Sequence, residues 1–266
     1  GLFLQPAGDL SFNDLVDAYR QQVLGQLAAG VDLFVIETMM DLAQTRAAIL
    51  AVRSLCDHPI LASMTVTENG RTLSGNPPLS CLLTCAGMGV AAFGLNCSFG
   101  PEKLNQLIVP LLSVSTIPLF LKPNAGLPQL VEGRTVFPMD AGTFAAALKQ
   151  PLKDGVRLIG GCCGTGPQHI EALSQLVQGI PLPAGSRLDQ NNWICSSKAC
   201  LKWQPEDKVP VVSPSDVSTL VDDVLDMETV SAPLIIDFTH LRDTDQLADA
   251  LQELQLMTDV PLIFRC

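Results

Sequence analysis

The chain has 266 residues, of which 47% are apolar and 16% are charged, and its formal net charge is −11. This much apolar material can form a sizeable core, so the composition excludes a largely disordered chain. The acidic balance argues against a nucleic-acid surface, which needs clustered lysine and arginine. The sequence contains no uninterrupted apolar run of 18 or more residues, so it predicts no membrane span.

In chain order, the sequence repeats one pattern: a short apolar run, a turn, and then an amphipathic helix. Ser11 and Asp14 occupy the positions of an N-terminal capping box, and Gly30 is a stop signal for the same helix. Helices are expected at 11–30, 41–56, 101–114, 140–153 and 167–179. Strands are expected at 2–8, 31–38, 59–66, 89–98, 117–126 and 155–165.

These six strand–helix units predict an α/β fold with a parallel sheet. Nearly continuous apolar strands are typical of parallel sheets covered on both faces, so we expect a (β/α)8 TIM-type barrel or an open doubly wound sheet. Both folds carry their chemistry at the carboxyl ends of the strands. The polar or reactive residues expected there are Glu37, Thr65, Glu68, Asn96, Cys97, Asn124, Cys162 and Cys163.

The chain after residue 180 has a different texture. Residues 1–180 form the β/α region, 181–192 read as a linker, and 193–266 predict a βαβαβ extension. Six strands do not close an eight-stranded barrel. Either the first two β/α units are absent, or the extension adds strands to the sheet, or the extension is a separate module.

The nine cysteines do not have the spacing of a disulfide framework. The first residues lack the basic region of a secretory signal, so we expect a cytoplasmic protein with reduced thiols. Cys56, Cys81 and Cys85 are interpreted as buried small apolar residues. The pair Cys195 and Cys200 is not expected to bind metal, and Cys266 is interpreted as a thiol at a strand end. The chain begins without methionine, which indicates a fragment or a processed chain.

Three other cysteines stand at expected strand ends, Cys97 in GLNCS and the pair Cys162–Cys163 in GGCCGT. Three thiolates can hold Zn²⁺ and leave the fourth tetrahedral position open for a substrate thiol, which would lose its proton there. Glycines on both sides of the pair would let both sulfurs turn toward one ion. Spacing alone leaves three alternatives open: core cysteines, a vicinal disulfide or a redox pair.

The motifs GLNCS (94–98) and GGCCGT (160–165) resemble those of the zinc-dependent homocysteine S-methyltransferases. Four further segments are similar to the homocysteine-binding module of cobalamin-dependent methionine synthase: FVIET (34–38), MTVTENGRTLSG (64–75), KPNAG (122–126) and GRTVFP (133–138). The similarity runs in order from about residue 1 to 180. A glycine-rich DGGMGT-type loop, which holds the homocysteine carboxylate in the family, does not occur in this chain. The resemblance therefore implies a barrel without its first two β/α units.

The resemblance also implies the residues of the site. Cys97, Cys162 and Cys163 would bind Zn²⁺, whereas His169 is expected to start a helix. Glu37 would receive the amino group of homocysteine, and Asn96 and Asn124 would orient the site. The full set of expected substrate-binding residues is Glu37, Asn96, Asn124, Thr65 and Glu68.

The implied reaction is methyl transfer to homocysteine to give methionine, with the zinc-bound thiolate as nucleophile. No cobalamin-binding DxHxxG motif occurs in the chain, so the resemblance implies a methylated corrinoid such as methylcobalamin on another domain or protein. A methylsulfonium or betaine donor is an alternative. Two other classes stay open: a non-catalytic zinc-binding remnant, and a redox protein that uses Cys162 and Cys163.

Overall fold

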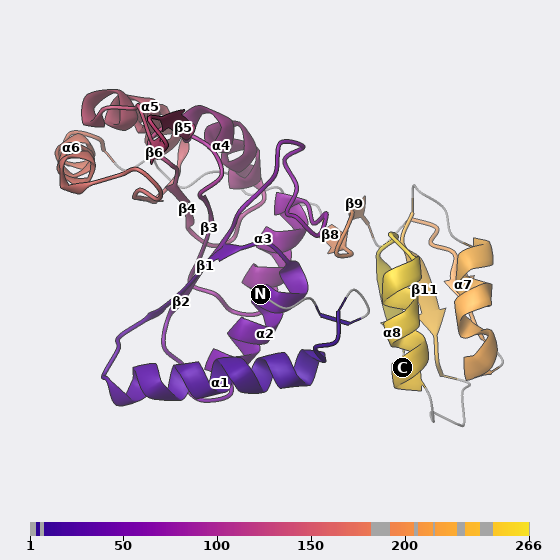
Figure 1. Ribbon diagram of the computed structural model, residues 1–266. Helices are drawn as coiled ribbons and strands as arrows, with labels where there is room; N and C mark the ends of the chain where they lie inside the picture. Colours follow the sequence, from indigo (N-terminus) through magenta and orange to yellow (C-terminus); the bar gives the residue numbers. More distant parts are fainter. Residues whose placement is uncertain are drawn as a thin grey trace. The chain divides into compact units, whose positions relative to one another are not determined.

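The computed structural model describes residues 4–5, 8–181, 192–204, 207–214, 216–227, 232–239 and 247–265. The chain divides into two compact units, Gly1–Asp189 and Gln190–Cys266 (Figure 1). No helix in the described ranges is long and apolar enough to cross a membrane.

The first unit is built on one parallel sheet of five strands in the order β1-β2-β3-β4-β7. Every neighbouring pair of strands is parallel. The strands are β1 (Phe34–Met39), β2 (Ile60–Met64), β3 (Ala92–Asn96), β4 (Leu119–Lys122) and β7 (Leu158–Ile159).

Six helices and a short 3-10 helix precede, connect or follow these strands. Ser11 accepts a hydrogen bond from the backbone N–H of Asp14, as the sequence predicts, and Asp41 and Asp140 cap α2 and α5 in the same way. The helices are α1 (Phe12–Ala28), α2 (Leu42–Arg53), α3 (Pro78–Gly87), α4 (Pro101–Ile108), η1 (Val109–Ser113), α5 (Ala141–Asp154) and α6 (Pro167–Gln178).

Alternation along the strands gives the sheet two different faces. Phe34, Ala62, Leu95 and Leu121 share one buried cluster with side chains of α2 to α6, so this face carries the main core. Residues of the opposite face are not part of that cluster. Helices therefore cover one face of this sheet, as they do in a barrel of the (β/α)8 type.

The opposite face is concave. The side chains of Glu37 on β1 and Lys122 on β4 form an ion pair across two intervening strands. Side chains leave a sheet roughly perpendicular to it, so this contact requires the sheet to curl around the face that carries them. Phe120 lies on the same face, and its ring lies directly over Gly94, where a Cβ would be 2.4 Å from the ring.

The described residues form an open parallel sheet with β1 and β7 at its edges, and the sequence already indicated too few strands to close an eight-stranded barrel. One expectation about the sheet needs correction. Of the predicted strand 2–8 the structure describes Leu4, Gln5 and Gly8, and none of these three is part of the sheet: Leu4 forms only an isolated bridge with Leu10.

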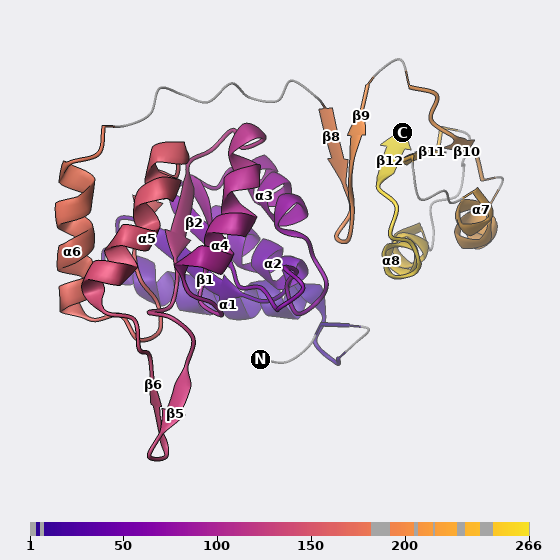
Figure 2. The same ribbon diagram turned by 90° about the horizontal axis from the view of Figure 1, so that it is seen from above.

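A hairpin interrupts the connection from β4 to α5. It consists of β5 (Gln129–Val131) and β6 (Arg134–Val136), which pair antiparallel. The hairpin projects away from the helices and the sheet (Figure 2), and all its strand residues are exposed. The sequence predicted only a long loop here.

The second unit has its own parallel sheet in the order β10-β11-β12. In the described residues these strands pair only with one another. The elements are β10 (Val211–Val212), η2 (Val217–Thr219), α7 (Leu220–Met227), β11 (Leu234–Asp237), α8 (Leu247–Met257) and β12 (Leu262–Arg265).

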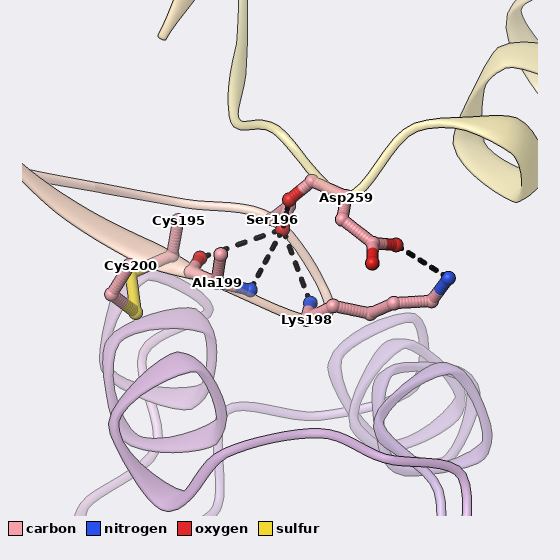
Figure 3. Close-up of a disulfide and its surroundings, with 6 residues drawn as sticks. All are labelled: Cys195, Ser196, Lys198, Ala199, Cys200 and Asp259. Carbon is pink, nitrogen blue, oxygen red and sulfur yellow. Dashed lines mark hydrogen bonds and ion pairs between the residues drawn. A yellow bond between two sulfur atoms is a disulfide. The ribbon is translucent and has the colours of Figure 1, made fainter. Parts of the chain in front are cut away.

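An antiparallel hairpin of β8 (Asn192–Cys195) and β9 (Cys200–Trp203) precedes this sheet. Cys195 and Cys200 face each other across the hairpin and form a disulfide (Figure 3). The expectation of a fully reduced protein is therefore wrong for this pair. Ser196 and Lys198 in the turn contact Asp259, through a hydrogen bond to its carbonyl and an ion pair with its carboxylate. Cys266 and the predicted linker, except its ends Pro181 and Asn192, lie outside the described residues.

Candidate metal centre

Three thiols meet at the carboxyl edge of the first sheet. Cys97 directly follows β3, and Cys162 and Cys163 follow β7, the strand on the other side of β4. Their three sulfur atoms all lie within 4.8 Å of one another, and the Sγ atoms of Cys97 and Cys163 are 3.7 Å apart. Residues 66 positions apart in the sequence thus form one cluster, because parallel strands end at the same edge.

A strained turn orients Cys97. Its φ is 62° and that of Ser98 is 59°, in the left-handed region that costs a non-glycine residue about 1 kcal/mol or more. The Cys97 N–H donates to the carbonyl of Lys122 over 3.1 Å, which ties the turn to β4. Thr38, at the end of β1, has a φ of 61°. Backbone strain of this kind gathers at functional sites.

The loop that carries Cys162 and Cys163 is fixed to the end of β4. The Cys162 N–H donates to the carbonyl of Pro123 over 2.9 Å, and the Cys163 N–H donates to Asn124 Oδ1 over 3.0 Å. Gly164 has a φ of +80°, and a Cβ there would lie 2.2 Å from the Cβ of Phe137. Only glycine fits at this position, so the glycine after the double cysteine has a direct steric reason.

Asn96 organises the polar side of the cluster from a fully buried position. Its Oδ1 accepts hydrogen bonds from the backbone N–H of Thr38 and from the hydroxyl of Ser63, both over 2.9 Å. Its Nδ2 donates to Thr38 Oγ1 over 2.7 Å and lies 3.7 Å from the Sγ of Cys162. This amide therefore links the ends of β1, β2 and β3 to the cysteine cluster.

Crowding makes the thiol of Cys163 hard to ionise. Desolvation by the surrounding atoms, followed by the neighbouring thiols of Cys97 and Cys162, raises the pKa of Cys163 to about 11. Three thiolates this close would repel one another, and a divalent cation between them removes that penalty. The cluster has the electrostatics of a site that needs a cation to become fully ionised.

The spacing of the sulfurs fits zinc. A tetrahedral zinc with Zn–S bonds of about 2.3 Å places its sulfur ligands about 3.8 Å apart. The distance of 3.7 Å between the Cys97 and Cys163 sulfurs agrees with this value, and all three sulfurs lie within 4.8 Å of one another. An all-thiolate set is also the donor type that zinc prefers.

Comparison with known proteins identifies the family of the first unit. Residues 2–177 match the family profile described as homocysteine S-methyltransferase. The chain belongs to the homocysteine S-methyltransferase family. This finding confirms the resemblance drawn from the GLNCS and GGCCGT motifs.

The family's relatives in the comparison include two long proteins. The chain is 34% identical over 189 residues to the methionine synthase of Mycobacterium tuberculosis and 33% identical over 183 residues to that of Mycobacterium leprae. These alignments cover 69% and 66% of this chain, but only 16% and 15% of the two relatives. The chain therefore spans about one sixth of the length of these relatives.

Solved structures of the family agree with the fold. The apo form of the homocysteine methyltransferase MmuM from Escherichia coli matches with a TM-score of 0.53 and 27% identity, over 63% of this chain and 58% of that one. The metallated form of the same enzyme matches with a TM-score of 0.50 and 27% identity, over 60% and 51% of the two chains. This family member is thus known in a metal-bound form.

The other residues expected in the family's site are spread along the same edge. Glu37 is exposed and pairs with Lys122. Thr65 is buried, and its hydroxyl lies 2.5 Å from that of Ser98. Asn124 is buried and holds the loop of Cys163. Glu68 is exposed in the turn after Thr67, and no hydrogen bond joins it to the cluster in the described part of the chain.

His169 does not face the sulfurs. Its Nδ1 accepts from the N–H of Gly166 over 3.1 Å, its Nε2 lies 3.0 Å from the carbonyl of Met139, and its ring packs edge-on against Phe144. Both ring nitrogens are therefore used at the start of α6, where the sequence places this residue.

Sequence reasoning missed three residues of this region, Thr38, Ser63 and Lys122. Lys122 and Ser63 share the alternation of Asn96 and so lie on its face of the sheet, which is the signal that could have found them. The sequence gives no such signal for Thr38, because the position of Thr38 beside Asn96 depends on the irregular register at the end of β1.

Proposed function

We propose that this chain binds homocysteine and Zn²⁺ for methyl transfer to the homocysteine sulfur, which gives methionine. Cys97, Cys162 and Cys163 would hold the metal through their thiolates. The observation that carries the proposal is the spacing of the three sulfurs, which come from two strands of one sheet and lie within 4.8 Å of one another.

The metal, when bound, would act as a Lewis acid that lowers the pKa of the substrate thiol. The chain's own residues then bind and orient the substrate. Glu37 is exposed at the end of β1 and offers a carboxylate to the ammonium group of homocysteine. Asn96 and Asn124 hold the cysteine loops, whereas Thr65 and Glu68 are assigned peripheral contacts with the substrate.

The methyl donor is proposed to be a methylated corrinoid, such as methylcobalamin, on another domain or protein. The methionine synthase relatives support this choice over a methylsulfonium or betaine donor. In the transfer, a bond forms between sulfur and the methyl carbon, and the bond from that carbon to the donor breaks with its electron pair left on the donor.

The fold supports a division of the chain into three parts. We assign the five parallel strands of residues 1–180 to the (β/α)8 barrel type of this family, residues 181–192 to a linker and residues 193–266 to an extension outside the metal site. The separate sheet of the extension supports this division.

The test measures metal content and proton release. Reduced wild-type chain is expected to hold about one zinc, and Cys162→Ala is expected to lose it, because two thiolates bind zinc far more weakly than three. Addition of homocysteine to the zinc-loaded wild type should release about one proton as its thiol binds.

Other outcomes favour the alternatives. Zinc without thiol binding or proton release would mean a non-catalytic zinc-binding protein. Reduced protein that holds no zinc, and whose Cys162 and Cys163 titrate reversibly as a two-electron pair, would mean a redox protein and would overturn the proposal.

A further inference from the structure

The ion pair between Glu37 and Lys122 lies beside the cysteine cluster. Lys122 is the register partner of Asn96, and its carbonyl accepts the hydrogen bond from the Cys97 N–H. The stem of Lys122 runs along Gly160, where a Cβ would lie 3.2 Å from its Cγ, and Cys162 follows two residues later. Lys122 therefore lies between two backbone segments, one leading to Cys97 and the other to Cys162.

A contribution to the free energy of folding does not explain why this ion pair is present. The Lys122 and Glu37 side chains are 30% and 43% exposed, and ion pairs with such access to water contribute little to stability. Both charges lie on the concave face of the sheet, which the core does not occupy. Their heads therefore remain within reach of a small solute on that face.

We propose that Lys122 binds the α-carboxylate of the substrate and so selects amino-acid thiols over simple amines that carry a thiol. This inference rests on the proposed function, because it assigns the second charge of the same substrate. An amino acid carries an ammonium and a carboxylate on one carbon. These two groups are complementary to Glu37 and Lys122, and one substrate can replace the direct ion pair with two charge-assisted contacts.

The exchange keeps the site neutral. With the pair closed, the carboxylate of Glu37 and the ammonium of Lys122 compensate each other. With a zwitterion bound, each protein charge has a new partner of opposite sign. A thiol that carries only an amine would form an ion pair with Glu37 and leave the charge of Lys122 without a partner. This cost is the physical reason why amino-acid thiols would bind more tightly than amine thiols.

The test compares three thiols on the full chain loaded with Co²⁺, whose sulfur-to-metal absorption band reports thiol binding directly. The ligands are homocysteine, 3-aminopropane-1-thiol, which lacks the carboxylate, and 4-mercaptobutanoate, which lacks the amine. Lys122→Gln is expected to weaken homocysteine and 4-mercaptobutanoate about tenfold or more, as for loss of a charge-assisted hydrogen bond. The affinity for 3-aminopropane-1-thiol should stay the same or rise, because Glu37 has lost its competitor.

Three variants serve as controls. Lys122→Arg keeps the charge and should retain most of the affinity for homocysteine. Glu37→Gln should give the opposite pattern, with weaker binding of the two amines. Lys149→Gln, on an exposed position of α5, makes the same change in net charge and should leave all three affinities unchanged.

The outcomes separate this inference from the proposed function. Equal weakening of all three thiols by Lys122→Gln, or unchanged homocysteine binding, would overturn the role of Lys122 and leave the metal site standing. Wild-type protein that holds cobalt but binds none of the thiols would overturn both.

Discussion

Cys81 and Cys85 lie one turn apart on α3 with no exposed surface, whereas Cys97, Cys162 and Cys163 lie in loops at the carboxyl edge of the sheet. Both groups bring thiols close together within one unit. Burial raises the pKa of Cys85 to about 12 and that of Cys81 further, with apolar neighbours that offer a cation no access. The edge group has the polar side chains of Asn96 and Asn124 beside it, and Cys163 is exposed. Access, more than proximity, separates a metal site from a pair of core residues.

The largest expected contrast between the two groups is in alkylation. In metal-free native protein, iodoacetamide should modify Cys163 at least about 100-fold faster than Cys85, since a buried thiol reacts only after local or global opening. Zinc should protect the edge group and leave Cys85 unchanged. Peptide mapping by mass spectrometry after timed labelling measures both rates, and urea-unfolded protein gives the reference in which all thiols react. Equal labelling of Cys85 and Cys163 in the native state would contradict the contrast.

The edge group should also depend on its glycines. Gly164→Ala combines a φ of +80° with a Cβ only 2.2 Å from Phe137, so the loop of Cys163 must move. We expect a loss of about 2 to 4 kcal/mol in the free energy of unfolding, by strain and overpacking, and a marked loss of zinc affinity.

Gly133→Ala is the matched control, because it has a similar φ of +76° in the β5–β6 turn but nothing within 4 Å of the added Cβ. It should cost about 1 kcal/mol and leave zinc bound. Urea unfolding and metal analysis of both variants measure these effects. Similar zinc loss in both would show that backbone strain from the positive φ, and not the contact with Phe137, accounts for the loss of zinc.

Much of this edge could be predicted from the sequence. Cys97 and the pair Cys162–Cys163 each follow an apolar run, and parallel strands end together, so their meeting follows from the β/α alternation. The buried state of Cys81 and Cys85 is likewise confirmed, since both are fully buried in the core cluster. These predictions depend on local pattern and on strand direction alone.

What could not be predicted depends on curvature and pairing. The contact between Glu37 and Lys122 requires the sheet to curl, which no local pattern encodes. The apolar run at 2–8 looks like a strand, yet Leu4 has only an isolated bridge and no place in the sheet. The disulfide of Cys195 and Cys200 depends on a hairpin, which sequence reasoning had not separated from the linker and extension.

The core group should appear in the pH dependence of stability. Burial holds the pKa of Cys85 at about 12, against an ordinary value of 9.0. Above pH 9 the unfolded chain releases this proton and the native state keeps it, so the free energy of unfolding falls as pH rises toward 12. At pH 10.5 the loss from this thiol is about 2 kcal/mol, from about 1.4 kcal/mol per pH unit.

Cys85→Ala tests this linkage, because it removes one such proton and keeps the thiols of the edge group. Its free energy of unfolding, measured by urea titration from pH 8 to 10.5, should fall less steeply than that of the wild type. Parallel curves for the two proteins would mean that Cys85 ionises in the native state.

The last comparison concerns the hydrogen bonds that hold the edge group. Asn96→Ala leaves the buried hydroxyl of Ser63 and the N–H of Thr38 without the acceptor they now share, at a cost of about 1 to 3 kcal/mol. Asn105→Ala is the comparison, since the Nδ2 of Asn105 donates one bond to Ala147 and its buried Oδ1 has no partner within the described structure. Removal of that unpaired oxygen offsets part of the loss, so this variant should cost less than Asn96→Ala.

Only Asn96→Ala should also weaken zinc binding, because the amide of Asn96 links three strand ends to the Cys162 sulfur. Urea unfolding and zinc titration of both variants measure the difference, and an unchanged zinc affinity in Asn96→Ala would show that the backbone bonds to Pro123 and Asn124 suffice to hold the cysteines.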